Sequence, residues 1–202
     1  MPGIDQLLAI DKSALGEASK TLHEEELPML VELLGEKDDD IRYKAFLLLQ
    51  YRSALYDDVY TFWEKFREKM KSSNSYQRSI GLMLIAENVR WDKLNKMDET
   101  IDDYLALLND EKPITVRQSI QSLAKIIPYK KHLLGKIADR LMKLEIDSIK
   151  ETMRKLILKD IIEVLIMIKK YEKHDDIDDY IFKAITGGLL DKKSVKLIEA
   201  LM

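Results

Sequence analysis

The sequence predicts an all-α protein built from about five helical hairpins stacked as a solenoid. Four arginines, Arg42, Arg78, Arg117 and Arg154, recur at intervals of 36, 39 and 37 residues, and each stands in a segment with helical apolar spacing. A period of this length is typical of helical hairpins that bury their apolar faces against their neighbours. Only 4 prolines and 7 glycines occur in 202 residues, which argues against a turn-rich β protein.

Composition narrows the class of protein further. Apolar residues make up 46% and charged residues 34% of the chain, enough for a core and a well-solvated surface. The absence of cysteine excludes disulfides and thiol chemistry. A net charge of −3 lacks the overall basic character of a general nucleic-acid binder. The 25 lysines against 8 arginines, with only 4 asparagines, favour a thermophilic prokaryotic source.

Neither a membrane span nor a signal peptide is expected. The longest apolar stretch, residues 161–168, is interrupted by Glu163 and is far shorter than the roughly 20 residues that a spanning helix needs. The first residues of the chain have no basic segment followed by a long apolar run. We therefore expect a cytoplasmic protein that does not bind a membrane.

The clearest hairpin lies at residues 24–55. Residues 27–34 have the spacing of an amphipathic helix, with Pro28 in its first turn, where a missing N–H costs little. Gly35 can end this helix. The acidic residues 38–40 can then cap the next helix and interact favourably with its dipole.

The remaining chain divides in the same way, within one domain. We expect an N-terminal capping helix at 1–22 and hairpins at 24–55, 56–92, 97–128, 129–172 and 175–202. The third hairpin repeats the first closely, and the fourth has a long second helix that Asp147 can cap. In the fifth, Lys196 replaces the recurring arginine.

A core stripe follows from aligning the units on the arginine. The residue before the arginine is apolar except for Gln77. Three residues after it stand the small side chains of Ala45 and Gly81, and then the larger Ile120 and Ile157. The small residues would let neighbouring helices approach closely.

The segments LPMLVELLGEKDDDIRYKAFLLL and IDDYLALLNDEKPITVRQSIQSLAKI resemble HEAT repeats. That family combines an apolar first helix, an acidic turn, an apolar residue followed by arginine, and a small residue three positions on. The resemblance implies a right-handed α-α superhelix that serves as a scaffold, and it implies no single activity. In such a stack the four arginines would form a structural ladder, pairing with acids in adjacent turns such as Asp38–Asp40, Asp110 and Asp147.

The leading functional hypothesis is a non-enzymatic scaffold or adaptor that binds a protein partner. Its binding surface would be the concave face formed by the second helix of each hairpin, called helix B. The helix-B positions that point away from the core stripe are Tyr43, Lys44, Tyr51, Met83, Arg90, Gln118, Lys125, Lys155 and Lys159. Tyrosine, methionine and arginine are enriched where interfaces form. We also expect homo-oligomer contacts through the C-terminal unit, because residues 201–202 stand in an apolar helical pattern.

No catalytic or cofactor motif is visible, so we expect neither an enzyme nor a bound cofactor. His23, His132 and His174 are too far apart in the sequence for a recognisable metal motif.

Asp160 stands among aliphatic residues. It could be a buried carboxylate at a site, or the solvated edge of an amphipathic helix beside Lys159.

The alternative hypothesis is nucleic-acid binding. The HEAT-like fold includes DNA glycosylases that excise alkylated bases, and Trp63, Arg90, Trp91 and Asp92 are residue types that such a groove uses. Residues 125–159 hold ten lysines and arginines against four acids, either a solvated face or a surface for an anionic partner. No glycosylase motif matches residue by residue, and the acidic net charge argues against this hypothesis.

Overall fold

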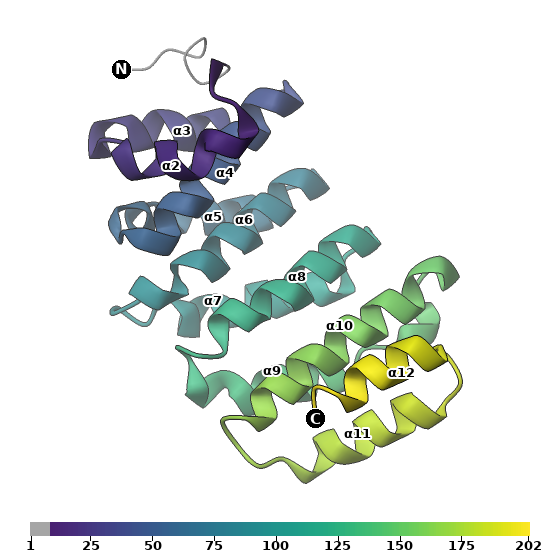
Figure 1. The fold of residues 1–202 in the computed structure, drawn as a ribbon. Helices are drawn as coiled ribbons and strands as arrows, with labels where there is room; N and C mark the ends of the chain where they lie inside the picture. The colour runs from purple at the N-terminus through teal and green to yellow at the C-terminus, as the bar shows by residue number, and fades with distance from the viewer. Residues whose placement is uncertain (1–8) are drawn as a thin grey trace. The chain divides into compact units, whose positions relative to one another are not determined.

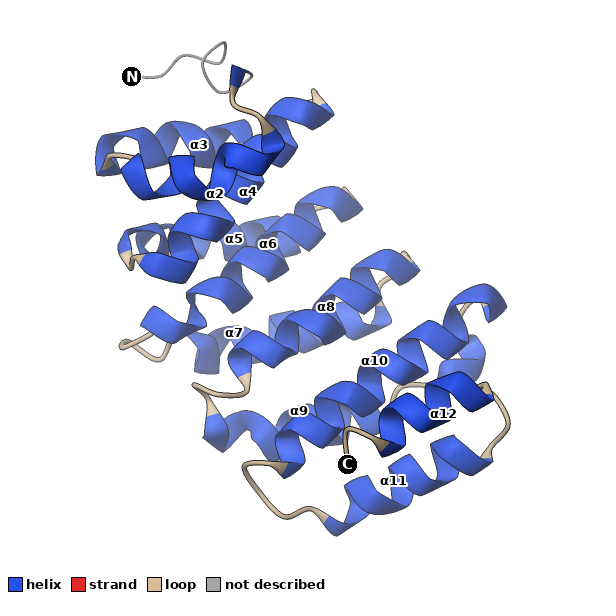
Figure 2. Ribbon diagram, in the orientation of Figure 1, coloured by secondary structure: helices blue, strands red, loops and turns tan. Residues whose placement is uncertain are grey.

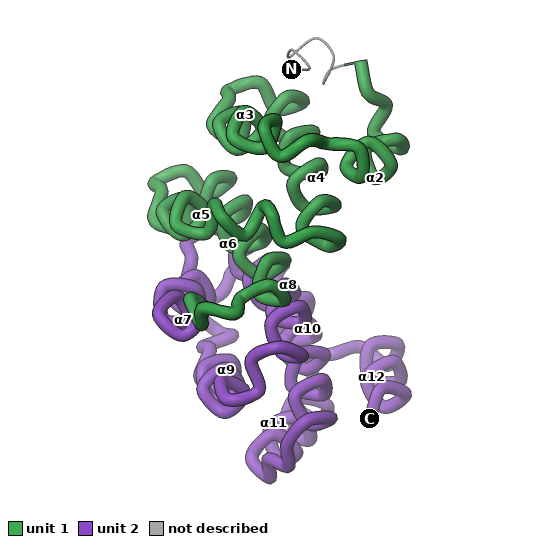
Figure 3. Tube along the Cα trace, turned by 90° about the vertical axis from the view of Figure 1, so that its left-hand side faces the viewer, with its two compact units in different colours: residues 1–96 green, residues 97–202 purple. Residues whose placement is uncertain are grey.

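The computed structural model describes residues 9–202, and all the regular structure in this range is helical (Figure 2). The predicted all-α class is therefore confirmed for the described residues. Residues 1–8 of the expected capping helix lie outside them. None of the described helices is both long enough and apolar enough to cross a bilayer. The chain divides into two compact units, residues 1–96 and 97–202, and the division falls between the second and third expected hairpins (Figure 3).

Unit 1 contains two packed hairpins and a short additional helix. Its helices are α2 (Leu15–Ala18), α3 (Leu27–Leu33), α4 (Asp39–Leu55), α5 (Trp63–Met70) and α6 (Ser75–Asn88) (Figure 1). Helix α3 packs against α4 and α5 packs against α6, while α4 also contacts α6. The second helices of the two hairpins therefore lie side by side.

Unit 2 is organised around one long helix. Its helices are α7 (Lys96–Ala106), α8 (Pro113–Ile126), α9 (Leu134–Met142), α10 (Glu151–Lys169), α11 (Asp175–Thr186) and α12 (Lys192–Glu199). Helix α10 packs against α8, α9, α11 and α12, and α11 also contacts α9. Nine side chains of α10 are buried, which explains its nearly continuous aliphatic sequence.

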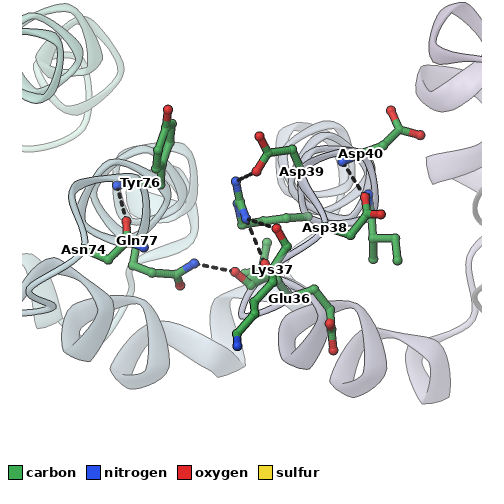
Figure 4. A network of polar contacts seen from close by, with 11 residues as sticks. Glu36, Lys37, Asp38, Asp39, Asp40, Asn74, Tyr76 and Gln77 are labelled. Atoms are coloured by element: carbon green, nitrogen blue, oxygen red, sulfur yellow. Dashed lines mark hydrogen bonds and ion pairs between the residues drawn. The ribbon is translucent and has the colours of Figure 1, made fainter.

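Side-chain caps set the starts of α4 and α6. The Asp38 carboxylate accepts hydrogen bonds from the N–H groups of Asp40 at 2.9 Å and Ile41 at 3.2 Å. The Asn74 side chain accepts from the N–H of Tyr76 at 2.9 Å (Figure 4). Both caps satisfy N–H groups that have no partner within the helix. The acidic turn thus performs the capping that the sequence predicts.

The start of α10 differs from the prediction. Asp147 lies in a short 3-10 turn, and α10 begins only at Glu151, without a side-chain cap at Lys150. Helix α8 likewise begins without a side-chain cap, because Pro113 takes its first position. Proline suits that position because its fixed φ and missing N–H cost nothing there.

Gly81 lets α5 and α6 approach closely, as the sequence predicts. A Cβ atom at this position would lie 2.5 Å from the Phe66 carbonyl oxygen and 3.0 Å from both the Met70 nitrogen and the Lys69 Cβ. The contact between α5 and α6 is the most extensive helix pair among the described residues. The glycine hydrogen therefore faces the backbone of the partner helix directly.

Contacts between successive hairpins recur at about one repeat length within each unit. In unit 1 the Lys65 ammonium lies 2.6 Å from the Glu32 carboxylate, 33 residues away in sequence. In unit 2 Lys136 pairs with Asp102 at 2.6 Å. Both pairs join the first helices of neighbouring hairpins. Within each unit, neighbouring hairpins are thus joined by ion pairs between their first helices.

Gln77, the polar exception in the core stripe, links three helices of unit 1. Its amide nitrogen donates to the Leu34 carbonyl at the end of α3 at 2.7 Å (Figure 4). Its amide oxygen accepts from Lys69 of α5 at 2.6 Å. We expect Gln77→Leu to lower the free energy of unfolding of unit 1 by about 1 kcal/mol, because both part-buried hydrogen bonds are lost. Urea unfolding monitored by tryptophan fluorescence measures this, and unchanged stability would contradict it.

Each unit also has one helix that packs against a second helix of a hairpin, on the side away from the first helices. In unit 1, α2 lies on the side of α4 opposite α3, and in unit 2, α12 lies on the side of α10 opposite α9 (Figure 3). The expected fifth hairpin does not close on itself. Instead, α11 and α12 each pack against α10, and they make no comparably extensive contact with one another.

Candidate partner-binding surface

Two ladder arginines in unit 1 hold the turn that precedes their own helix. Arg42 donates to the Glu36 carbonyl at 2.8 Å and pairs with the Asp39 carboxylate (Figure 4). Arg78 donates at 2.9 Å to each carbonyl of residues 72–73. The main-chain carbonyls are partners that the sequence analysis did not foresee. These arginines stabilise the hairpin turns.

The arginines of unit 2 differ from each other. Arg154 repeats the turn contact: its Nε donates to the Ile149 carbonyl at 2.8 Å, and its guanidinium lies 3.7 Å from the Asp147 carboxylate. Arg117 does not use the expected Asp110. It pairs with Asp160, 43 residues along the chain, and the Asp110 carboxylate instead accepts a hydrogen bond from the N–H of Lys112 at 2.8 Å.

The Asp160 carboxylate is buried, which decides between the two interpretations left open by the sequence. Its side chain is 5% exposed, and it accepts hydrogen bonds from Arg117 Nε at 2.6 Å, Arg117 Nη2 at 3.2 Å and Gln121 Nε2 at 3.0 Å. Its hydrogen bond raises the pKa of the Arg117 guanidinium above the ordinary value. The carboxylate joins α8 to α10, so its role is to hold the two helices together.

An exposed apolar stripe runs along α4. We define the α4 stripe as Tyr43, Leu47, Tyr51 and Leu55, which stand four residues apart and so share one side of the helix. Tyr43 is 48%, Tyr51 41% and Leu55 49% exposed, and Leu47 is partly exposed. Exposed apolar side chains in a continuous row are typical of protein-binding surfaces.

Lys44 stands beside this stripe, yet its side chain is buried. It is only 6% exposed, and its ammonium lies 3.4 Å from the Asp40 carboxylate. Eight residues on, Arg52 donates to the carbonyls of Ser19 and Lys20 at 3.2 and 3.3 Å. The segment around α2 therefore covers this side of α4, and Lys44 offers little surface to a partner.

Met83 of α6 and Arg90 of the 3-10 turn that follows α6 are available to a partner to different degrees. Met83 is partly exposed and Arg90 is exposed. Arg90 also donates to the Ala54 carbonyl near the end of α4, and its guanidinium lies 5.6 Å from the centre of the Trp91 ring. Arg90 therefore already serves to join the ends of α4 and α6.

On α8, Lys125 is exposed and Gln118 is half-buried. The side-chain oxygen of Gln118 is buried and has no hydrogen-bond partner among the described residues. The oxygen of Gln118 therefore points into the interior of unit 2, where an unsatisfied acceptor costs stability. Gln118 offers less surface to a partner than Lys125 does.

On α10, Lys155 and Lys159 are partly exposed and both form ion pairs. Lys155 pairs with Asp191, the N-cap of α12, and Lys159 lies 3.4 Å from Glu163. The Lys155 ammonium and the N–H of Ser194 hold the pKa of the Asp191 carboxyl well below its usual range. The predicted helix-B residue Lys155 therefore already contacts another helix of its own chain.

Two grooves that no sequence pattern indicates lie between the first helices of neighbouring hairpins. A groove of about 440 Å³ separates α3 from α5, and one of about 430 Å³ separates α7 from α9. Their charged lining includes Lys65, Glu68 and Lys69 in the first, and Lys136, Arg140 and Lys143 in the second. Burial lowers the pKa of the Lys69 ammonium from its ordinary value. Helix periodicity alone does not reveal grooves of this kind.

Two of the residues considered for a nucleic-acid enzyme, Trp63 and Asp92, lie in the interior of unit 1. Trp63 is fully buried. Asp92 is also buried, and it accepts hydrogen bonds from the Tyr60 hydroxyl at 2.7 Å and the Lys96 N–H at 2.9 Å. Burial, followed by the hydrogen bond to Asp92, raises the pKa of Tyr60 above its ordinary value. The aspartate positions the start of α7 and does not line an open groove.

Within residues 9–202, no three potential metal-ligating side chains converge on one point. His132 instead lies 2.9 Å from the Asp98 carboxylate, across the first helices of two hairpins.

Comparison of the chain with protein-family models, curated proteins and solved structures finds no significant match. The geometry of the described residues therefore carries the functional argument.

Proposed function

We propose that the chain is a HEAT-like repeat protein, a right-handed α-α superhelix that acts as a non-enzymatic scaffold. It binds a protein partner through the concave surface that its B helices form, on the faces that point away from the first helices. The α4 stripe is the centre of this surface in unit 1, with Met83 of α6 as a further contact. The partner contributes apolar side chains that pack against the two tyrosines and the two leucines.

Two features of the contacts inside each unit support the repeat architecture. Ion pairs and hydrogen bonds between hairpins recur at about one repeat length inside each unit, as Lys65 with Glu32 and Lys136 with Asp102 illustrate. Three ladder arginines hold the turns before their own helices. Both features are expected when one hairpin design is used several times.

The exposure of the α4 stripe is the observation that carries the functional proposal. Tyr43, Tyr51 and Leu55 each leave between two fifths and half of their surface in contact with water. Aromatic side chains placed in this way give large contact area for little loss of conformational freedom, which favours binding.

We expect Tyr51→Ala to abolish capture of a protein partner while lowering the free energy of unfolding by less than about 1 kcal/mol. Little stability is lost because the side chain is already 41% exposed. The measurement combines capture of partners from a lysate of the source cells on the immobilised chain with urea unfolding. Tyr129→Ala, which alters a comparably exposed tyrosine in unit 2, is the matched control and should leave capture intact.

Three outcomes would count against this proposal. A stability loss of several kcal/mol for Tyr51→Ala would show that the residue belongs to the core. Capture that is equal for Tyr51→Ala and Tyr129→Ala would remove the α4 stripe from the binding surface. Recovery of nucleic acid alone, and only at low salt, would favour the nucleic-acid hypothesis instead.

A further inference from the structure

Helix α12 occupies the outer face of α10, where the helix-B surface of unit 2 would otherwise be open. It lies on the side of α10 opposite α9 (Figure 3). Its N-cap residue, Asp191, pairs with Lys155, which the sequence predicts to contact a partner. A helix of the same chain therefore covers part of the expected binding surface.

The contact combines one ion pair with a narrow apolar stripe. Leu190, Ser194 and Ile198 stand four residues apart, and all three are buried. Asp191 also accepts a hydrogen bond from the N–H of Ser194 at 2.8 Å, so the same carboxylate caps α12 and binds α10. The face of α10 thus holds an amphipathic helix that carries an acid at its N-cap.

Helix α12 is held by few contacts. It has only eight residues, and α10 is the one described element with which it makes extensive contact. Two glycines precede it, and Gly188 adopts a positive φ of 78°. Leu197 and Leu201 remain about half exposed. Helices this short are marginal in water on their own, so α12 depends on α10 to stay helical.

We propose that the outer face of α10 is a docking site for an amphipathic helix of the protein partner, and that α12 fills it until that helix displaces it. The displacing helix presents an acidic side chain to Lys155 and an apolar residue at the position of Ile198. This inference rests on the proposed scaffold function and names the kind of partner that the scaffold accepts.

A peptide with the sequence of residues 187–202, carrying a fluorescent label, serves as the partner helix in the test. We expect it to bind the full-length chain weakly, because α12 competes at the high effective concentration of a tethered segment. Asp191→Lys in the chain removes the cap of α12 and sets a like charge against Lys155. Peptide affinity, measured by fluorescence anisotropy, should then rise about tenfold.

A charge exchange makes the test specific for this face. The full-length Lys155→Asp chain should lose affinity for the native peptide, relative to the Asp191→Lys chain, and gain affinity for a peptide carrying Asp191→Lys. Lys196→Ala in the chain changes an exposed residue of α12 and is the matched control. It should leave peptide affinity at the wild-type value.

Hydrogen exchange of the α12 amides accompanies each binding measurement. Loss of protection in the Asp191→Lys chain without any peptide binding would overturn the proposal, because an uncovered α10 face would not accept a helix. Retained protection would also overturn it, since α12 would not be displaceable. Neither result depends on partner capture through Tyr51. The docking site on α10 and the binding role of the α4 stripe can therefore each be disproved without the other.

Discussion

Gly81→Ala is expected to destabilise unit 1 by about 3 kcal/mol. Alanine normally stabilises a helix by about 1 kcal/mol relative to glycine, so a gain would be predicted from helix propensity alone. Here the added Cβ would lie 2.5 Å from the Phe66 carbonyl oxygen, which belongs to the backbone of α5 and cannot rotate away. Separating the two helices therefore outweighs the gain in propensity.

Urea unfolding monitored by tryptophan fluorescence tests this in the right part of the chain, because Trp63 and Trp91 are the only two tryptophans and both lie in unit 1. Gly16→Ala in α2 is the matched control, since no atom lies within 4 Å of the added Cβ. It should leave stability unchanged or raise it by up to about 1 kcal/mol. Equal stability of the Gly81→Ala chain and the wild type would contradict the close packing of α5 against α6.

Asp160→Ala should lower the free energy of unfolding of unit 2 by about 3 kcal/mol. The substitution leaves the Arg117 guanidinium, which is 24% exposed, without its anionic partner, and it removes the acceptor of Gln121. Breaking one side of a buried ion pair is costly because the remaining charge stays desolvated. Helices α8 and α10 would lose the hydrogen bonds that Asp160 makes between them.

The double variant Arg117→Met/Asp160→Leu separates charge burial from packing. Because it removes both charges together, it should lose less stability than Asp160→Ala. Hydrogen exchange of the α8 and α10 amides is the measurement, since unit 2 contains no tryptophan. Lys159→Ala, whose exposed pair with Glu163 contributes less than about 0.5 kcal/mol, is the control. A double variant as unstable as Asp160→Ala would mean that the loss comes from packing alone.

Much of the local structure could be predicted from residue spacing. The helical apolar period predicts the all-α class, the acidic turn predicts the Asp38 cap, and the small residue at Gly81 predicts a close helix contact. Each of these depends on residues within one or two turns of one another. Helix periodicity and capping act over that range, so the sequence itself reports them.

The exposed surface was predicted only in part. Tyr43 and Tyr51 are exposed as expected, and Leu55, which extends the same stripe, was missed although its spacing of four residues was visible. Lys44, which the sequence also places away from the core stripe, is buried, because α2 packs over its side of α4. No local pattern in residues 39–55 indicates that a segment from residues 15–21 covers them.

The sequence by itself therefore determined that this chain is helical, where α4 begins and which faces of the helices are apolar. Only the tertiary structure decided that Arg117 pairs with Asp160, that α2 covers Lys44 and that α12 lies on α10. Local propensity and periodicity depend on neighbours a few residues away. Partners that are 33 to 43 residues apart are chosen by the packing of whole helices, where burial and charge pairing compete among many arrangements.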